Sequence, residues 1–319
     1  MKILVTGGAG FIGSNIVGTL LKDEKINEVR VLDNLSTGSM ENLKEFTTNP
    51  RFSFIEADIR NSAACIKACD GIDLITHQAA LGSVPRSIND PLTTNDVNIT
   101  GTLNIFLAAK EKRIKRVVYA ASSSTYGDHP GLPKQEDKIG KPLSPYAVTK
   151  LVNELYAKVF GELYGTEFIG LRYFNIFGPK QNPKGPYAAV IPLFAEAILN
   201  NKPPTMNGDG THSRDFTFVE NAVQANLLSL FTENKNAVNQ VYNIACGVQT
   251  SLLELFNQLQ KEAGVSIQPI FGSERKGDVK HSLADITKAQ QLLDYRPVVS
   301  VGEGLAITYN WYKGQSKKK

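Results

Sequence analysis

The stretches KILVTGGAGFIGSNIVGTLLK (2–22) and EVRVLD (28–33) decide the fold. Residues 2–6 form a short apolar run, and a glycine-rich turn then opens an amphipathic stretch that extends to Lys22. The second apolar run ends at Asp33. Two apolar runs joined by a helical pattern are typical of a βαβ unit, in which a helix connects two parallel strands.

The same alternation of apolar runs and helical patterns continues along the chain. Further strands are predicted at 52–58, 72–77, 116–122 and 166–175. Helices are predicted around 63–68, from about Asp90 to Lys112, and from Ser144-Pro145 to about Tyr164. Continuous apolar strands that alternate with helices predict an α/β fold with a Rossmann-type, doubly wound parallel sheet.

The composition changes after Gly178, where PKQNPKGP (179–186) is rich in proline, glycine and lysine. We therefore expect a Rossmann domain at 1–180 and a smaller α/β ligand-binding domain at 181–319, with some exchange of strands and helices. The elements expected after 180 are a helix at 189–199, a turn at 207–210, a strand at 213–219, and helices ending near Leu230 and lying near 251–263 and 303–312. Small C-terminal regions of this kind commonly cover a ligand at the carboxyl ends of the strands.

The composition excludes several classes of protein. The chain has 319 residues, 42% of them hydrophobic, which is enough for a sizeable core. A net charge of +4 is modest, so we predict no nucleic-acid partner. The cysteines, Cys65, Cys69 and Cys246, are odd in number and favour free thiols in a reducing compartment. With no apolar run of about 18 residues and no leader-like start, we expect a cytoplasmic protein without a membrane partner, and we predict no metal site.

Three glycines in the first turn predict a dinucleotide site. Gly7 permits the tight turn, Gly10 lets a pyrophosphate approach the helix N-terminus, and Gly13 lets the helix pack closely on the strand. Asp33 ends the second strand twenty residues after Gly13, where a carboxylate accepts from both ribose hydroxyls and repels a 2′-phosphate. The pattern favours NAD over NADP, and a glycine-rich turn with no ligand is the alternative.

Asp58, at the end of the third predicted strand, has two interpretations. Its side chain could bind the adenine amine while Ile59 supplies a backbone contact. Alternatively, Asp58 caps the helix that begins near Asn61.

The stretch SPYAVTK (144–150) carries the candidate catalytic residues. Tyr146 and Lys150 lie four residues apart on a predicted helix and therefore share one face. An ammonium beside a phenol favours the phenolate, so we expect Lys150 to lower the pKa of Tyr146. The serines Ser122, Ser123 and Ser124 close the preceding strand and place hydroxyls in the same crevice.

With these motifs in place, the chain resembles the extended short-chain dehydrogenase/reductases and, within them, the sugar-nucleotide 4-epimerases. The resemblance covers almost the whole chain. The stretches that carry it are GGAGFIG (7–13), DNLSTG (33–38), ADI (57–59), HQAA (77–80), VNITGTLN (97–104), SSSTYG (122–127), PYAVTK (145–150), RYFNIFGP (172–179), NGDGTHSRDF (207–216) and RKGD (275–278).

The resemblance implies two sets of ligand-binding residues. The residues implied for NAD are Gly7, Gly10, Phe11, Ile12, Gly13, Asp33, Asn34, Ser36, Thr37, Gly38, Asp58, Ile59, Gln78, Ala79, Ala80, Asn98, Tyr146, Lys150 and Tyr173. Those implied for a UDP-sugar are Gly82, Ser83, Ser122, Ser123, Tyr146, Asn175, Ala189, Val190, Asn207, Arg214, Arg275, Asp278 and Ser282. Among them, Arg214 and Arg275 would clamp the pyrophosphate and Asp278 would bind the uridine ribose. Taken singly, each arginine is more typical of a solvated surface charge, and the family spacing is what favours the clamp.

The serines before TYG favour epimerisation over dehydration. The related 4,6-dehydratases carry an Asp-Glu pair, and the related UDP-glucuronate decarboxylases a glutamate, where this chain has Ser123 and Ser124. Without a carboxylic acid, elimination loses its general acid. The resemblance then implies that Tyr146 removes the 4-hydroxyl proton, directly or through Ser122 or Ser123, while NAD⁺ takes hydride from C4. A 4-keto sugar forms, rotates in the site and is reduced on its opposite face.

Ser282 bears on the size of the sugar. In the family register it falls where glucose/galactose-restricted epimerases carry a tyrosine, so the serine leaves room for an acetamido group, although a packing serine is the local alternative. The stretch GSVPRSINDP (82–91) also resembles epimerases of N-acetylated sugars. Together these features predict a UDP-N-acetylglucosamine/UDP-N-acetylgalactosamine 4-epimerase that also accepts UDP-glucose and UDP-galactose. The rivals are a UDP-glucuronate-type 4-epimerase, for which Arg86 is a candidate contact, and a non-catalytic NAD(H)-sensing or scaffold protein. The family also implies a homodimer through the helix starting near Asp90 and the Tyr146 helix.

Overall fold

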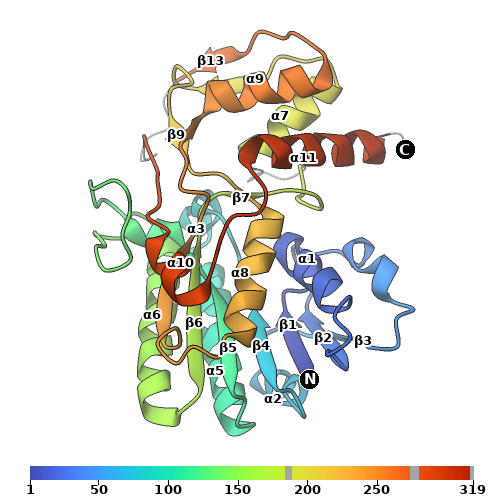
Figure 1. Ribbon diagram of the computed structural model, residues 1–319, viewed down its shortest axis with the longest axis vertical. Coiled ribbons are helices and arrows are strands. Elements are labelled where there is room, and N and C mark those ends of the chain that lie inside the picture. The colour runs from blue at the N-terminus through green and yellow to red at the C-terminus, as the bar shows by residue number, and fades with distance from the viewer. Residues whose placement is uncertain (184–188, 274–279, 317–319) are drawn as a thin grey trace.

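A seven-stranded parallel sheet forms the centre of the protein. The computed structural model describes residues 1–183, 189–273 and 280–316. The strand order is β3-β2-β1-β4-β5-β6-β11, and every pairing is parallel (Figure 1). The strands are β1 (Lys2–Thr6), β2 (Glu28–Asp33), β3 (Phe52–Glu56), β4 (Leu74–His77), β5 (Arg116–Ser122), β6 (Glu167–Tyr173) and β11 (Gln240–Ile244). The predicted Rossmann-type fold is confirmed.

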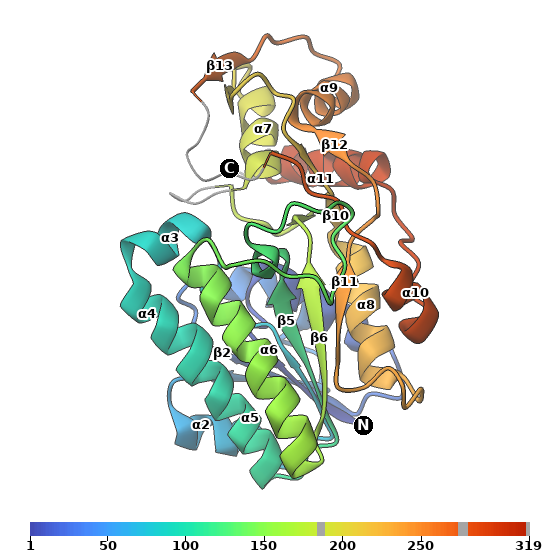
Figure 2. The same cartoon turned by 90° about the vertical axis from the view of Figure 1, so that its left-hand side faces the viewer.

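Helices cover both faces of the sheet, as the apolar character of its strands requires (Figure 2). One face carries α1 (Phe11–Leu20), α8 (Val219–Phe231) and α10 (Thr287–Leu293). The other carries α2 (Ser62–Ala68), α5 (Thr102–Glu111) and α6 (Pro145–Tyr164). Helix α6 begins as the sequence predicts, because the Ser144 hydroxyl accepts from the Ala147 amide at 3.2 Å and Pro145 occupies the first turn.

The predicted helix from Asp90 to Lys112 has an internal change of pitch. It consists of α4 (Pro91–Asn95), a π-helical turn η3 (Asp96–Gly101) and α5. A short helix that the sequence pattern did not predict, α3 (Val84–Asn89), precedes it. Other short helical turns are η1 (Met40–Asn42), η2 (Lys44–Phe46) and η4 (Ser123–Tyr126).

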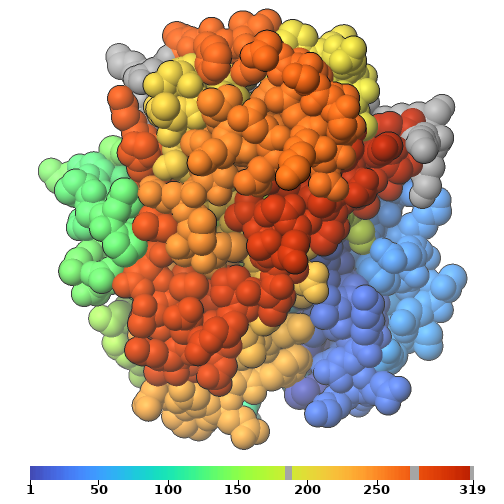
Figure 3. All heavy atoms as spheres, turned by 45° about the horizontal axis from the view of Figure 1, so that its top comes forward, coloured from blue at the N-terminus to red at the C-terminus, as the bar shows by residue number. Residues whose placement is uncertain are grey.

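The C-terminal elements form a smaller layer at the carboxyl ends of the strands, at the top of Figure 1, where α7 is yellow, α9 orange and α11 red; this layer comes forward in Figure 3. Its helices are α7 (Val190–Leu199), α9 (Leu252–Ala263) and α11 (Val301–Ser316). Its strand pairs are β7 (Ile176–Phe177) with β10 (Thr217–Phe218), β9 (Ser213–Arg214) with β12 (Thr250–Ser251), and β8 (Thr205–Asn207) with β13 (Ile270–Gly272). β11 and α8 also follow residue 180 but belong to the sheet layer.

One predicted strand is wrong. The stretch 213–219 does not form a single strand but divides into β9 and β10. The break falls at Asp215, whose carboxylate accepts from the backbone amides of Cys246 and Gly247 at 2.9 and 3.0 Å. The side chain therefore points inward to satisfy those amides, and the ladder cannot continue through it.

Within the described ranges, no helix is long and apolar enough to cross a membrane. Nor does that part of the chain contain a group of three or more His, Cys, Asp or Glu side chains that could hold a metal ion. Cys65, Cys69 and Cys246 are free thiols.

Candidate active site

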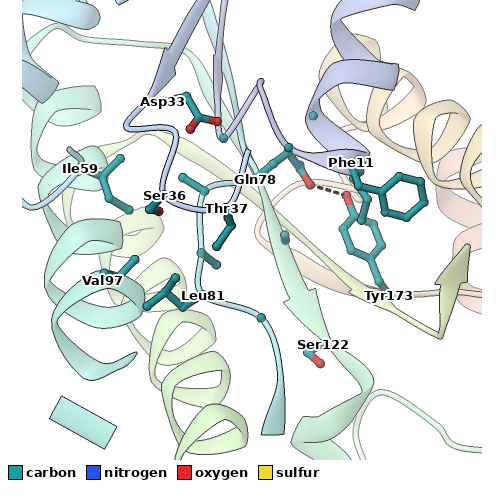
Figure 4. A pocket seen from close by; sticks show the side chains of 18 of the residues that line it. Phe11, Asp33, Ser36, Thr37, Ile59, Gln78, Leu81, Val97, Ser122 and Tyr173 are labelled. Carbon is teal, nitrogen blue, oxygen red and sulfur yellow. Dashed lines mark hydrogen bonds between the residues drawn. The ribbon is translucent and has the colours of Figure 1, made fainter. Parts of the chain in front are cut away.

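The reversal of strand order between β1 and β4 opens a crevice at the carboxyl ends of these strands. A cavity of about 420 Å³ lies there. Figure 4 shows its side chains converging from the turns after β1, β2 and β4 and from β5 and β6. The loops that follow parallel strands therefore supply most of this cavity.

The glycine turn after β1 has the geometry of a phosphate cradle. Gly7 has a φ of +68°, and a Cβ there would come within 2.6 Å of the Ala79 backbone nitrogen. At Gly13 a Cβ would collide with the carbonyl of Gly7, so helix and turn pack as the spacing predicts. Gly10 precedes α1 without a side-chain cap, which leaves the first-turn amides available to an anion.

Asp33 ends β2 with its carboxylate held in place. The carboxylate accepts from the amides of Ala9 and Leu35 at 2.9 and 2.8 Å, and the side chain is buried. Burial raises the pKa of Asp33, while the two amides oppose this shift. Each oxygen keeps a lone pair for a ribose hydroxyl, so this position fits a dinucleotide.

Asp58 also lines the cavity, and its capping interpretation is wrong. The cap of α2 is Asn61, whose side chain accepts from the Ala64 amide at 3.1 Å. Asp58 instead pairs with Arg60 at 2.7 Å and accepts from Asn34 at 2.9 Å. The Arg60 guanidinium is the main reason that the pKa of Asp58 falls to about 2.

Most residues implied for NAD lie along this cavity, but two do not. Gly38 packs against Ala9, which its Cβ would meet at 2.8 Å, and so supports the glycine turn from outside. Asn98 is fully buried and exchanges two hydrogen bonds with the Leu81 backbone, at 2.8 and 3.1 Å. Both residues therefore shape loops that line the cavity rather than lining it themselves. The residues that do line it are Gly7, Gly10, Phe11, Ile12, Gly13, Asp33, Asn34, Ser36, Thr37, Asp58, Ile59, Gln78, Ala79, Ala80, Tyr146, Lys150 and Tyr173.

A polar network fixes the floor of the cavity. The Tyr173 hydroxyl donates to Gln78 Oε1 at 3.1 Å, the contact dashed in Figure 4, and accepts from Asn226 Nδ2 at 2.7 Å. Gln78 in turn donates to Asn226 Oδ1 at 3.0 Å. Burial raises the pKa of Tyr173 to about 12, so this tyrosine is a neutral hydrogen-bonding group.

Tyr146 and Lys150 line the same cavity from α6, but the expected effect of Lys150 on the pKa of Tyr146 is absent. The Lys150 ammonium lies 5.9 Å from the centre of the Tyr146 ring and donates to the Ala120 carbonyl at 2.7 Å. Burial raises the pKa of Tyr146, and the hydrogen bond from Ser122 is the influence that lowers it. Burial also lowers the pKa of Lys150 to about 8, against the opposing charge of Glu154.

The three serines after β5 have distinct positions. Ser122 lines the first cavity beside Tyr146, and its Oγ accepts from the Ser124 amide and hydroxyl at 3.1 and 2.9 Å. With its lone pairs used this way, the Ser122 hydroxyl is free to donate to the phenol oxygen. Ser123 and Ser124 line a second cavity.

The second cavity has a volume of about 510 Å³ and meets the first at Asn175, which lines both. Of the residues implied for a UDP-sugar, it contains Ser123, Asn175, Arg214 and Ser282. Gly82, Ser122 and Tyr146 line the first cavity. The described residues Ser83, Ala189, Val190 and Asn207 line neither cavity, and Arg275 and Asp278 fall outside the described ranges. Arg86, the candidate contact for a sugar with a C6 carboxylate, also lies outside the lining of both cavities.

Sequence reasoning missed much of the second cavity, because a motif does not show which of its side chains will face a cavity built from several segments. The missed residues are Val84, Pro85, Ile88, Asn89, Tyr126, Gly127, Lys134, Leu143, Ser144, Ala147 and Phe174. In the first cavity it missed Gln181, whose buried Oε1 has no hydrogen-bond partner in the described structure. An unpaired buried acceptor in a cavity with a glycine cradle and a ribose-type carboxylate fits a bound NAD.

Residues 179–181 form a strap beside this cavity. Asn15 donates to the Pro179 carbonyl at 3.3 Å, and the Tyr312 hydroxyl donates to the Gln181 carbonyl. Lys180 donates to the Asn42 carbonyl at 2.9 Å and pairs with Glu45 at 3.0 Å. The strap thus ties α1, the turns after β2 and α11 together at one side of the cavity.

Comparison with known proteins agrees with this geometry. The NAD dependent epimerase/dehydratase family matches residues 3–245. A UDP-glucose 4-epimerase from Mycolicibacterium smegmatis is 35% identical over 99% of this chain and 100% of its own. The structure of a UDP-N-acetylglucosamine 4-epimerase from Methanobrevibacter ruminantium, in complex with UDP-N-acetylmuramic acid, is 41% identical, covers 98% of both chains and has a TM-score of 0.93. A UDP-glucuronic acid 4-epimerase from Bacillus cereus, with UDP-glucuronic acid and NAD, is 34% identical over 99% and 100%, with a TM-score of 0.91.

A Rossmann fold with a glycine cradle and a tyrosine–lysine pair defines an NAD-dependent enzyme of the short-chain dehydrogenase/reductase class. Within that class, the chain belongs to the NAD dependent epimerase/dehydratase family. It is an epimerase, its cofactor is NAD, and the predicted family resemblance is confirmed.

Proposed function

We propose that this enzyme interconverts UDP-N-acetylglucosamine and UDP-N-acetylgalactosamine at C4, with UDP-glucose and UDP-galactose as secondary substrates. The observation that carries the proposal is the wall of the second cavity. Ser123, Ser124 and Ser282 are small hydroxyl residues, and no carboxylate is among the described residues that line this cavity. Small side chains leave room for an acetamido group, and the missing acid disfavours dehydration.

Each side chain near the reacting carbon has a chemical role in this proposal. Bound NAD supplies a hydride acceptor and donor for C4. Tyr146 takes up and returns the proton of the 4-hydroxyl, with Ser122 oriented toward it by Ser124. Because burial holds the pKa of Tyr146 above its ordinary value, Tyr146 needs additional positive charge to act as a base. The cationic nicotinamide of bound NAD⁺ would supply this charge, with Lys150 as the cation among the described residues that line the cavity.

Different parts of the second cavity would anchor the diphosphate and let the sugar rotate. Arg214, which lines the second cavity, would hold the diphosphate by charge-assisted hydrogen bonds. The sugar itself would face small residues that let a 4-keto intermediate rotate. Binding energy from the diphosphate, which is remote from the reacting carbon, would retain the intermediate, while weak contacts to the sugar would let it rotate.

A UDP-glucuronate-type 4-epimerase is the second candidate. One observation favours it: the charged residues among the described lining of the second cavity, Lys134 and Arg214, are both cations. Such a cavity would also accept a sugar with a C6 carboxylate. The relatives from M. ruminantium and B. cereus support the two alternatives respectively. A non-catalytic sensor is disfavoured, because Tyr146, Lys150 and Ser122 are all present in one cavity.

The substrate is tested by incubating the purified enzyme separately with UDP-N-acetylglucosamine, UDP-glucose and UDP-glucuronic acid and resolving the 4-epimers by proton NMR. We expect the largest kcat/KM for the acetylated sugar. A larger value for UDP-glucuronic acid would replace the proposal with its rival.

The role of Ser282 is tested by Ser282→Tyr. A phenol ring would fill the space beside the sugar, so we expect conversion of UDP-N-acetylglucosamine to be lost and conversion of UDP-glucose to be retained. The backbone amide of Ser282 donates a hydrogen bond to the Ser213 carbonyl at 3.1 Å, and this bond does not depend on the side chain at position 282. Ser282→Ala is the matched control and should behave like the wild type. Equal activity of the tyrosine variant on both sugars would show that Ser282 does not limit substrate size.

We also propose a homodimer through α6 and the neighbouring α4 and α5. The outer face of α6 exposes Val148, Leu155, Val159 and Leu163, at helical spacing, and α4 exposes Leu92. An apolar stripe of this length is typical of an interface. Sedimentation should give twice the mass of the chain, and Leu155→Glu with Val159→Glu should yield monomers. A wild-type monomer at micromolar concentration would contradict the proposal.

A further inference from the structure

Lys134 is a second cation in the second cavity. It lines this cavity together with Arg214, and neither the sequence motifs nor the family resemblance assigned it a role. Arg214 has an expected partner in the diphosphate. The charge of Lys134 therefore needs a separate explanation.

Lys134 is buried with few partners. Its residue is 5% exposed, and its ammonium donates to the carbonyl of His129. Across the described chain, this carbonyl is the one acceptor within hydrogen-bond reach of the ammonium, and no carboxylate pairs with it. An ammonium has three donors, so its hydrogen-bonding capacity is not used up. Burial also lowers the pKa of Lys134, as expected for a cation that lacks a charged partner.

The backbone of Lys134 is fixed against the segment that carries Ser282. The Lys134 amide donates to the Leu283 carbonyl at 2.7 Å, and the Lys134 carbonyl accepts from the Asp285 amide at 2.9 Å. These bonds place Lys134 opposite Ala284 in a parallel bridge. Because side chains alternate along an extended chain, Ser282 lies on the same side as Ala284 and therefore as Lys134. Both side chains line one cavity wall.

Further contacts hold this wall rigidly. Asn243 Nδ2 donates to the Lys134 carbonyl at 2.8 Å, and the Tyr126 hydroxyl donates to Asn243 Oδ1 at 2.6 Å. The Arg172 guanidinium lies 4.8 Å from the centre of the Tyr126 ring. The lysine stem thus starts from a fixed position, which a specificity contact requires.

We propose that Lys134 is a specificity-determining residue that donates to a carbonyl or carboxylate oxygen on the sugar, next to the space left by Ser282. This inference rests on the proposed function. Two substituents offer such an oxygen: the acetamido group at C2 and a carboxylate at C6. A plain hexose offers hydroxyls alone, which pair less strongly with a buried cation. Lys134 would therefore increase kcat/KM for substituted sugars, whereas Ser282 only leaves space for the additional group.

The test compares Lys134→Met, which keeps an unbranched stem and removes the charge, with Lys138→Met. Lys138 lies on the same loop but is exposed, so the control makes the same charge change outside the cavity. Steady-state kinetics on UDP-N-acetylglucosamine, UDP-glucuronic acid and UDP-glucose separate the two sources of the oxygen. We expect kcat/KM to fall on the order of 10-fold or more for the substituted sugar that Lys134 binds, and less than about twofold for UDP-glucose.

A selective loss on the acetylated sugar assigns the contact to the acetamido carbonyl, and a selective loss on UDP-glucuronic acid assigns it to the carboxylate. Equal losses on all three sugars, or no loss on any, would overturn the inference. A wild-type enzyme that converts UDP-glucose alone would also overturn it, while leaving the 4-epimerase activity intact. If the wild type converts none of the three even with NAD added, the proposed function itself fails. Melting temperature and NAD content verify folding, and Lys134→Gln replaces the methionine variant if that variant does not fold.

Discussion

The first cavity, which we propose holds NAD and call the cofactor cavity, and the second, which we propose holds the sugar nucleotide and call the substrate cavity, are built in different ways. The cofactor cavity takes its phosphate cradle and its ribose carboxylate from one βαβ unit, in which Gly7, Gly13 and Asp33 lie within 27 residues. The substrate cavity draws its wall from α3, the loop after β5, α6, Arg214 and Ser282. Local sequence therefore specifies the glycine cradle and the carboxylate of the first cavity, whereas the whole wall of the second cavity depends on distant segments being held together. Variants in the two regions should fail differently.

The largest effect is expected at Tyr146, which lines the first cavity. Tyr146→Phe removes the hydroxyl that we propose exchanges a proton with the sugar, and kcat should fall about 10³-fold. NAD content should stay unchanged, because the ring and the Lys150–Ala120 bond remain. Tyr156→Phe, an exposed tyrosine on the same helix, is the matched control. A Tyr146 variant that keeps more than a tenth of wild-type turnover would contradict the assigned role.

A change at Asp215 should damage the substrate region selectively. Its carboxylate accepts from the amides of Cys246, Gly247 and Ala284, and Ala284 lies two residues from Ser282. Asp215→Ala leaves these buried amides unpaired, so the free energy of unfolding should fall by about 2–4 kcal/mol, as measured by urea denaturation. KM for the UDP-sugar should rise, while NAD content changes little.

Asp209→Ala is the control for this variant, since Asp209 is exposed and bonds to its neighbour Thr211. Loss of NAD from Asp215→Ala, without a change in KM, would mean that the two regions are not separable in this way.

The smallest effect is expected at the strap. Lys180→Met breaks the bonds to Asn42 and Glu45 but leaves the cavity lining intact. Bound NAD should then dissociate several-fold faster, because an exposed ion pair and one carbonyl bond together stabilise the closed strap by about 1 kcal/mol. The NAD content of the protein after gel filtration measures this loss. The reverse pattern, with full NAD retention and a raised KM for UDP-sugar, would assign the strap to the substrate region.

The sequence predicted the first half of the fold well, because apolar strands and the glycine turn act locally. It missed β11, whose short stretch QVYNI follows polar residues in a region assigned to the second domain. It predicted an unbroken strand at 213–219, since nothing local shows that the Asp215 side chain would turn toward amides far along the chain.

The site shows the same limit. Asn98 and Gly38 were expected to touch NAD, but neither is among the residues that line the first cavity, and they contact the Leu81 backbone and Ala9 respectively. The pKa of Tyr146 was expected to fall, but pattern alone does not reveal that the ammonium of Lys150 is directed to a backbone carbonyl. Lys134 carried no motif, and its burial inside a ligand cavity is visible only in three dimensions.

The central proposal is that NAD held in the first cavity would accept a hydride from C4 of the sugar and return it to the same carbon. The direct test uses UDP-N-acetylglucosamine with deuterium at C4, incubated in ordinary water with the purified enzyme and no added cofactor. We predict formation of UDP-N-acetylgalactosamine with the deuterium retained at C4, observed by NMR and mass spectrometry. Product in which C4 carries hydrogen from water would contradict the account, because the stereocentre would then be inverted by proton exchange.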